Sequence, residues 1–309
     1  MSSCREEFSL AALRLQHHDR SVFSRSPWWR GQVGFVVYKS LIAVLTLAVL
    51  VFLLVYHYHV QGRSDPWPVA LTNWSFTILT AHMLVALAVC VVDFLSKQKG
   101  TGPTTVDNTS ENSSPGDAGM EEAVPMTEIG RDNDDDAVQS SSGPAWYHKV
   151  HWVLHNTSIA AAFLVTTVYW TLDRATVSVS SIFEHVVNSV IALLDLSLSG
   201  TPVRILNVIY PVAYAATYAV FYVIYWAAGG KGRDGATAIY AVMDFGNSPG
   251  MASGVMVAFV FVGAPVFHLL SYGLYRLREV VVSKLERRTP VILLSSETTN
   301  SRNVHSQLV

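Results

Sequence analysis

Long apolar runs separated by polar stretches dominate the chain. Five runs of membrane-spanning length occupy residues 37–58, 70–95, 150–172, 203–228 and 253–275. A sixth run follows residue 181, ends before Gly200 and includes several polar groups. A helix needs about 20 predominantly apolar residues to cross a hydrocarbon core of roughly 30 Å. The pattern therefore predicts an all-α, polytopic membrane protein built as a bundle of six transmembrane helices.

The composition supports a membrane protein over a soluble one. Half of the residues are hydrophobic (50 %), 14 % are charged, and the mean hydropathy is +0.32. Soluble domains carry about a quarter charged residues. The acidic residues are concentrated in one loop and the basic residues flank the apolar runs, so no basic field is available for a nucleic acid.

The apolar runs divide the chain into five parts. We expect a cytoplasmic N-terminal tail over residues 1–36, two transmembrane helices over 37–95, a disordered acidic cytoplasmic loop over 96–147, four transmembrane helices over 148–275 and a basic cytoplasmic tail over 276–309. The loop is rich in Gly, Ser, Thr, Pro, Asn and acidic residues. Such a composition buries too little apolar surface to offset the entropy of ordering.

Positive charges near the runs predict the orientation in the membrane. Six crossings place both termini on one side, and that side carries Arg20, Arg25, Arg30, Lys97, Lys99, Lys149, Arg204, Arg276, Arg278, Lys284, Arg287 and Arg288. The opposite side carries Arg63, Arg174, Lys231 and Arg233. Because Lys and Arg are enriched in cytoplasmic flanks, both termini are predicted to be cytoplasmic, in the plasma membrane or an endomembrane.

The stretch Glu184–Asp195 carries polar groups inside an apolar run. His185, Asn188 and Asp195 recur at helical spacing and therefore share one face of a helix. Ionisable groups within a span cost roughly 2.5–3.5 kcal/mol each on insertion scales, so they normally face the protein interior or a wet cavity. We expect this face to look inward and to mark a functional site.

Other polar groups lie in the remaining runs. The polar intramembrane candidates are Asn73, His82, His151, His155, Asn188, Asp195 and His268. His148, His151 and His155 follow one helical face, and such a stripe is able to bind a metal ion. Because their segment holds neither a cysteine nor a carboxylate, hydrogen bonding to neighbouring helices is the favoured interpretation. No metal site and no cofactor is predicted.

A series of motifs occurs in a fixed order along the runs. They are Ala70-Leu71-Thr72-Asn73-Trp74-Ser75, His185-Val186-Val187-Asn188-Ser189, Leu194-Asp195, Pro202-Val203-Arg204, Ile209-Tyr210-Pro211-Val212 and Ala227-Ala228-Gly229-Gly230, followed by Tyr240 and Asp244. With these motifs the chain resembles the rolling stone family of animal membrane proteins over all six runs. The resemblance implies an integral membrane protein that acts in cell–cell fusion of myoblasts or in membrane organisation, without implying a molecular activity.

The chain also has a more distant similarity to the androgen-induced membrane hydrolases, which cleave fatty acid esters of hydroxy fatty acids. This similarity implies a lipid substrate, an intramembrane threonine nucleophile at Thr72 and a catalytic histidine. In one register that histidine falls on His185 and a following acid on Asp195. In the other register it falls on Asn188, and the general base is absent. Both registers stay open.

Three classes of function follow. A rolling stone-like membrane protein of unknown molecular activity is favoured, an intramembrane threonine hydrolase with catalytic Thr72 and His185 is the alternative, and a transporter or channel is the second alternative. A threonine hydroxyl needs a base to take its proton. Asp195 lies about ten residues, or roughly 15 Å, along a helix from His185, so it cannot orient that ring. The lipid bilayer is the expected partner, and the sequence leaves protein partners undefined.

Overall fold

The computed structural model describes six stretches of the chain, residues 14–29, 31–63, 65–100, 143–172, 177–232 and 235–305, with side chains described up to residue 98 in the third stretch and residue 287 in the last. Most of the expected acidic loop lies outside the described residues, including Asn108 and Asn112, each of which begins an Asn-x-Ser/Thr glycosylation motif. Three of the arginines used to predict the orientation, Arg30, Arg174 and Arg233, also lie outside. Every regular element in the described stretches is helical, which confirms the all-α prediction.

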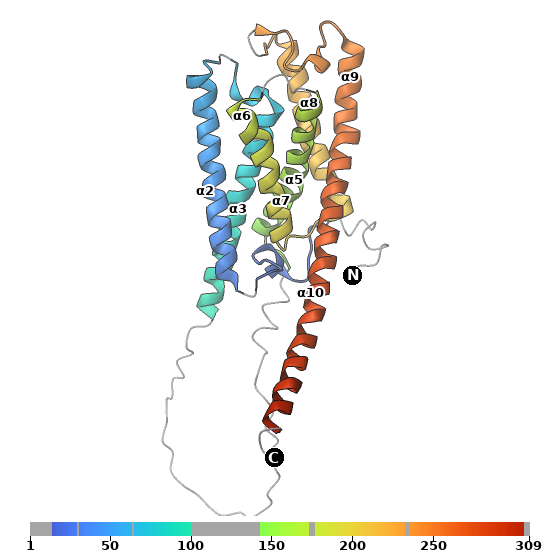
Figure 1. Ribbon diagram of the computed structural model, residues 1–309. Helices are drawn as coiled ribbons and strands as arrows, with labels where there is room; N and C mark the ends of the chain where they lie inside the picture. Colours follow the sequence, from blue (N-terminus) through green and yellow to red (C-terminus); the bar gives the residue numbers. More distant parts are fainter. Residues whose placement is uncertain are drawn as a thin grey trace, which may run out of the picture.

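The helices run alongside one another in a bundle (Figure 1). The long elements are α2 (Gln32–Val55), α3 (Leu71–Gly100), α5 (Trp146–Leu172), α7 (Asn188–Leu198), α8 (Ile209–Ala227), α9 (Pro249–Ala258) and α10 (Ala264–His305). Short 3₁₀ helices, η2 (Arg20–Phe23), η4 (Trp67–Val69), η6 (Ile205–Val208) and η8 (Ala241–Met243), lie in the connections. α10 continues through Tyr275, so the expected basic tail begins within a helix.

Three turns of π-helix interrupt or extend these rods. The first, η3 (Tyr56–Val60), continues α2, and the second, η5 (Ile182–Val187), joins the short α6 (Val179–Ser181) to α7. The third, η9 (Phe259–Gly263), joins α9 to α10. A π turn is a local i→i+5 bulge in an α-helix and is frequent at functional sites. All three π turns contribute residues to the cavities described below.

Five of the described helical segments are long and apolar enough to cross a membrane. They are Gln32–Val60, Leu71–Gln98, Val179–Leu198, Ile205–Ala227 and Pro249–Arg287. The helix α5 is long enough, with 27 residues, but its polar side chains keep it outside this set. The expected count of six spans is therefore one more than length and apolarity support, although the polytopic membrane class is confirmed.

The position of α5 explains its polarity. It packs against α3, α7, α8 and α10, so most of its side chains face protein and not lipid. Three consecutive alanines, residues 160–162, are buried there and allow neighbouring backbones to come close. By contrast, α2 exposes most of its aliphatic side chains and buries a single stripe at intervals of three or four residues, namely Phe35, Lys39, Ala43, Thr46, Val49 and Leu53.

The loop after α7 is held against the N-terminal segment by a close backbone approach at Gly200. Its N–H donates to the carbonyl of Arg25 at 2.9 Å, and a Cβ there would lie 2.5 Å from the carbonyl oxygen of Val22. We expect Gly200→Ala to lower the free energy of unfolding by about 1–3 kcal/mol, since it forces these backbones apart. Denaturant unfolding of the purified protein in detergent measures this loss. The matched control is Gly254→Ala in α9, where a Cβ meets nothing within 4 Å; equal stabilities of the two variants would contradict the prediction.

Candidate functional site

The charge centre, defined here as Lys39, His82, His155 and Asp195, lies inside the bundle. The Lys39 ammonium, from the buried stripe of α2, forms an ion pair with Asp195 Oδ1 on α7. Both side chains are completely buried. Removing two charges from water is costly, and such a pair persists only with good geometry and further polar partners.

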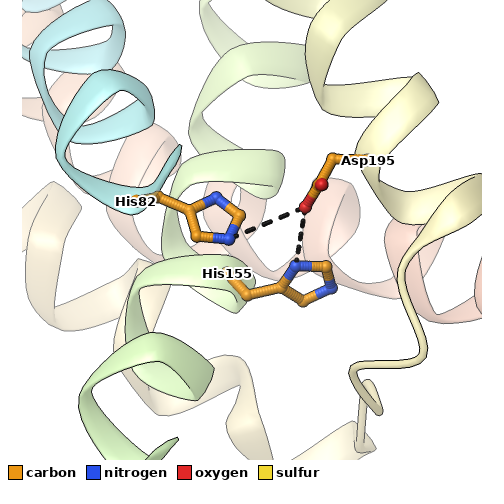
Figure 2. Close-up of side chains that lie close together, drawn as sticks. All are labelled: His82, His155 and Asp195. Carbon is orange, nitrogen blue, oxygen red and sulfur yellow. Dashed lines mark ion pairs between the residues drawn. The ribbon is translucent and has the colours of Figure 1, made fainter. Parts of the chain in front are cut away.

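Two histidines supply those further partners. The Nε2 atom of His82, on α3, lies 3.6 Å from Asp195 Oδ2, and Nδ1 of His155, on α5, lies 3.3 Å from the same oxygen. Figure 2 shows the two rings pointing at the carboxylate from different helices. All three groups are completely buried. Four helices, α2, α3, α5 and α7, therefore meet at one carboxylate.

A second layer of polar groups surrounds the charge centre. Ser158 Oγ lies 2.9 Å from His82 Nδ1 and donates to the backbone carbonyl of His155 at 3.4 Å. His151 packs its ring 5.2 Å from that of His82, and its Nε2 atom lies 2.9 Å from Thr201 Oγ1. The stripe of histidines on α5 thus points into the bundle, where the hydrogen-bonding partner of His151 lies in the loop after α7.

A polar cavity of about 260 Å³ opens toward the opposite end of α7. Its lining includes Arg63, Asp65, Thr72, Glu184 and His185. Arg63 forms two hydrogen bonds with the Asp65 carboxylate, at 2.6 and 2.8 Å. Burial raises the pKa of Asp65, but these bonds and the charge of Arg63 outweigh it and hold that pKa below its ordinary value. The carboxylate is therefore ionised at neutral pH.

An apolar cavity of about 350 Å³ adjoins the polar one. Its wall is mostly aliphatic and aromatic and comes mainly from α5 and residues 239–243, with further side chains from α9 and η9. Leu164, Val168, Val255 and Phe259 belong to it. Thr72, Tyr169, Ile239 and Tyr240 line both cavities. An apolar space and a polar space therefore lie side by side, and Thr72 is one of the residues between them.

The residues that decide between the two hydrolase registers have different surroundings. His185 is buried in the π turn η5, with its ring stacked on Tyr169 at a centroid distance of 3.8 Å. Its Nδ1 atom has no hydrogen-bond partner among the described residues. Asn188 donates its amide to Ser75 Oγ at 3.1 Å. His185 thus lines the polar cavity with Thr72, while Asn188 bonds to a neighbouring helix.

The structure places the other sequence-predicted residues in structural roles. Asn73 donates to the carbonyl of Trp67 at 2.6 Å and so fixes the start of α3. His268 Nε2 lies 2.9 Å from the carbonyl oxygen of Arg204, which ties α10 to the loop before η6. The inward face predicted for residues 184–195 is confirmed, because His185, Asn188 and Asp195 are all buried.

The predicted residues fall into two groups at different depths of the bundle. His82, His155 and Asp195 meet at the charge centre, whereas Thr72 and His185 border the cavities. Sequence analysis missed Lys39, which stands near the start of an otherwise aliphatic run. Two features of the sequence could have revealed it: Lys39 lies inside a predicted span, and the carboxylate of Asp195, inside another span, needs a positively charged partner.

Comparisons with known proteins support the family resemblance. A family model described as "Protein rolling stone" matches residues 135–290, a region that includes His155 and Asp195. "Protein rolling stone" of Drosophila melanogaster is 25 % identical over 288 residues, which cover 90 % of this chain and 90 % of that protein. No solved structure matches the chain.

Proposed function

Since the chain belongs to the rolling stone family of membrane proteins, we propose that it acts in membrane organisation or cell–cell fusion by binding an amphipathic lipid in the two adjoining cavities. The observation that carries this proposal is the shared wall of Thr72, Tyr169, Ile239 and Tyr240 between an apolar and a charged space. The apolar part accepts an acyl chain and the polar part accepts a headgroup or ester.

The size and lining of the cavities support a bound lipid. Sites for small ligands occupy roughly 300–1,000 Å³ and combine apolar walls with a few placed polar groups. The apolar cavity alone has about 350 Å³, and the adjoining cavity adds about 260 Å³. Arg63 and His185 are available to donate hydrogen bonds to ester or phosphate oxygens, while the Tyr218 hydroxyl already donates to the carbonyl of Val69 at 2.9 Å.

Lipid binding is tested by narrowing the apolar cavity. Val255 lines that cavity, so Val255→Trp fills part of the space for the acyl chain. We expect the affinity for a fluorescent fatty acid ester to fall about 10-fold or more, equivalent to roughly 1.4 kcal/mol. The measurement is equilibrium binding to the full-length protein in detergent. Val257→Trp on the same helix, where Val257 is 57 % exposed, is the matched control and leaves the affinity unchanged. Equal affinities for both variants would contradict the proposal.

A second candidate function, ester hydrolysis, is favoured by one further observation, that Thr72 and His185 line the same cavity. In this mechanism His185 takes the proton of the Thr72 hydroxyl, and the threonine oxygen attacks the ester carbonyl. The bond from the carbonyl carbon to the alcohol oxygen breaks, His185 gives its proton to the leaving alcohol, and water then hydrolyses the acyl-threonine to the free acid. We expect His185→Ala and Thr72→Val to lower turnover of a branched fatty acid ester by about 10²-fold or more. Thr77→Val, at an exposed position of α3, keeps full turnover. Absence of turnover by a wild type that binds the lipid would remove hydrolysis and leave lipid binding intact.

The orientation with both termini in the cytoplasm is also a proposal, supported by the distribution of Lys and Arg. It places the sequons at Asn108 and Asn112 where glycans are not added. We therefore expect no mobility shift of the native chain with a glycan-removing enzyme, and a shift when a sequon is inserted within residues 235–248. Expression in mammalian cells followed by gel electrophoresis measures both. Detection of a glycan at Asn108 or Asn112 would contradict the proposed orientation and indicate the opposite one.

A further inference from the structure

We propose that the charge centre binds a first-row divalent metal ion, such as Zn²⁺, through His82 Nε2, His155 Nδ1 and Asp195 Oδ2. These three atoms lie within 4.8 Å of one another and come from three helices, α3, α5 and α7 (Figure 2). This site is separate from the lipid cavities, because His82 lies ten residues, or about 15 Å, along α3 from Thr72.

The distances fit a metal ion bound between the three atoms. Zinc bonds to histidine nitrogen and carboxylate oxygen measure about 2.0–2.2 Å, so two ligands of a tetrahedral ion lie about 3.3–3.5 Å apart. His155 Nδ1 and His82 Nε2 lie 3.3 and 3.6 Å from Asp195 Oδ2. These two separations match a tetrahedral ion, and the two nitrogens, which lie within 4.8 Å of each other, have to be brought closer by rotation of the rings.

The hydrogen-bonding state of the three atoms points to a missing ligand. Within the described part of the chain, none of the three makes a hydrogen bond of good geometry, although all are buried and the two nitrogens lie at ion-pair distance from Asp195 Oδ2. Buried polar atoms normally have such a bond, because leaving one unpaired away from water is unfavourable. Three such atoms facing one point are explained by a cation that accepts electron pairs from all of them.

Ser158 orients His82 for this role. In the proposed metal-bound form, Ser158 Oγ accepts the Nδ1–H of His82, from which it lies 2.9 Å, while its own hydroxyl donates to the carbonyl of His155 at 3.4 Å. This arrangement leaves Nε2 with its lone pair directed toward Asp195. Metal-binding histidines commonly donate their other ring N–H in this way, which fixes the tautomer and the ring orientation.

The number of ligands predicts the kind of site. Structural zinc sites have four protein ligands, whereas three protein ligands leave a fourth position for water or a substrate group. The ligand set of two histidines and one carboxylate suits Zn²⁺ and neighbouring transition metals better than Mg²⁺ or Ca²⁺, which prefer oxygen. We therefore expect one water molecule on the ion.

Lys39 opposes the metal ion and provides a sharp test. Its ammonium pairs with Asp195 Oδ1 and repels a cation bound at Oδ2. We expect Lys39→Met to bind Zn²⁺ at least 10-fold more tightly than the wild type, because the repulsion is gone and the carboxylate is then neutralised by the ion alone. A hydrogen-bonded centre without metal predicts no such gain.

The experiment measures metal content and affinity of the full-length protein in detergent. We expect about one Zn²⁺ per chain after dialysis, and tetrahedral absorption bands when Co²⁺ replaces it. His82→Gln and His155→Gln lose both signals. The matched control is His148→Gln, which keeps both signals. His148 is a buried histidine of α5, as His155 is, but its Nε2 atom lies 3.1 Å from Asp93 Oδ2.

A milder variant decides the outcome if the ligand variants fail to give folded protein. Ser158→Ala keeps the three ligands and removes only the group that orients His82, so the dissociation constant for Zn²⁺ rises about 10- to 100-fold. Wild-type protein that binds no more Zn²⁺ than His82→Gln, or a Ser158→Ala variant with unchanged affinity, would overturn the proposal.

Discussion

Lys39→Met is expected to lower the free energy of unfolding by about 3–5 kcal/mol in the absence of added metal. The substitution leaves the Asp195 carboxylate completely buried without its cationic partner. Breaking a buried ion pair by removing one partner is costly because an uncompensated charge stays in a medium of low dielectric constant. Equilibrium unfolding in mixed micelles, followed by tryptophan fluorescence, measures the loss.

Two further variants separate this effect from a general loss of packing. The double variant Lys39→Met/Asp195→Leu removes both charges and is expected to recover most of the stability, since replacing a buried pair by apolar residues is often neutral. Lys149→Met makes the same substitution at an exposed position of α5 and changes stability by less than about 0.5 kcal/mol. A loss for Lys39→Met as small as that for Lys149→Met would contradict the importance of the pair.

Trp152→Ala is expected to cost about 3–5 kcal/mol, the usual range for removing a large buried aromatic side chain. Trp152 is completely buried on α5, and its indole N–H donates to the carbonyl of Pro202 at 2.6 Å. Its ring packs 5.2 Å from Phe23 of η2 and 4.7 Å from the guanidinium of Arg204. One side chain therefore joins the N-terminal segment and the loop after α7 to the central helix.

The same helix offers a matched control for this prediction. Trp146 is 75 % exposed, so Trp146→Ala changes the free energy of unfolding by less than about 0.5 kcal/mol. Hydrogen exchange gives a second readout, since Trp152→Ala is expected to increase exchange of backbone amides in residues 20–25 more than in α8. Uniform exchange along the chain would refute the specific role of Trp152 as an anchor.

Most of the fold was predictable from the sequence, because apolar runs of sufficient length have few alternatives in a membrane. The central place of α5 was not predictable in the same way. Its polar side chains lower its hydropathy, which by itself argues against a transmembrane helix. A helix that is surrounded by other helices needs less apolar surface, but only the structure shows that α5 is surrounded in this way. The inward face of residues 184–195 followed from helical spacing alone.

The charge centre was only partly predictable. Helical spacing brought His151 and His155 to one face, but the carboxylate beside His155 comes from α7, and no pattern within one segment reveals a neighbour on another helix. Lys39 escaped attention because lysines near the end of a span often extend their amines to the membrane surface. Here the ammonium turns inward because Asp195 offers a countercharge.

The choice between the hydrolase registers depended on three-dimensional packing. His185 and Asn188 are about one helical turn apart, so helical spacing predicts the same inward orientation for both. Both are buried in the structure. The partner of Asn188 is Ser75, whereas His185 borders the cavity that contains Thr72. The structure therefore favours testing His185 as the base, and the sequence alone could not order the two.

The three π turns all lie in the part of the bundle that surrounds the cavities. Each turn shifts the helical register by one residue, and removing that extra residue would return a regular α-helix and rotate everything beyond it by about 100°. The turns border the cavities, whereas the charge centre is held by regular helices. The choice of side chains that face the cavities therefore depends on the extra residue in each π turn.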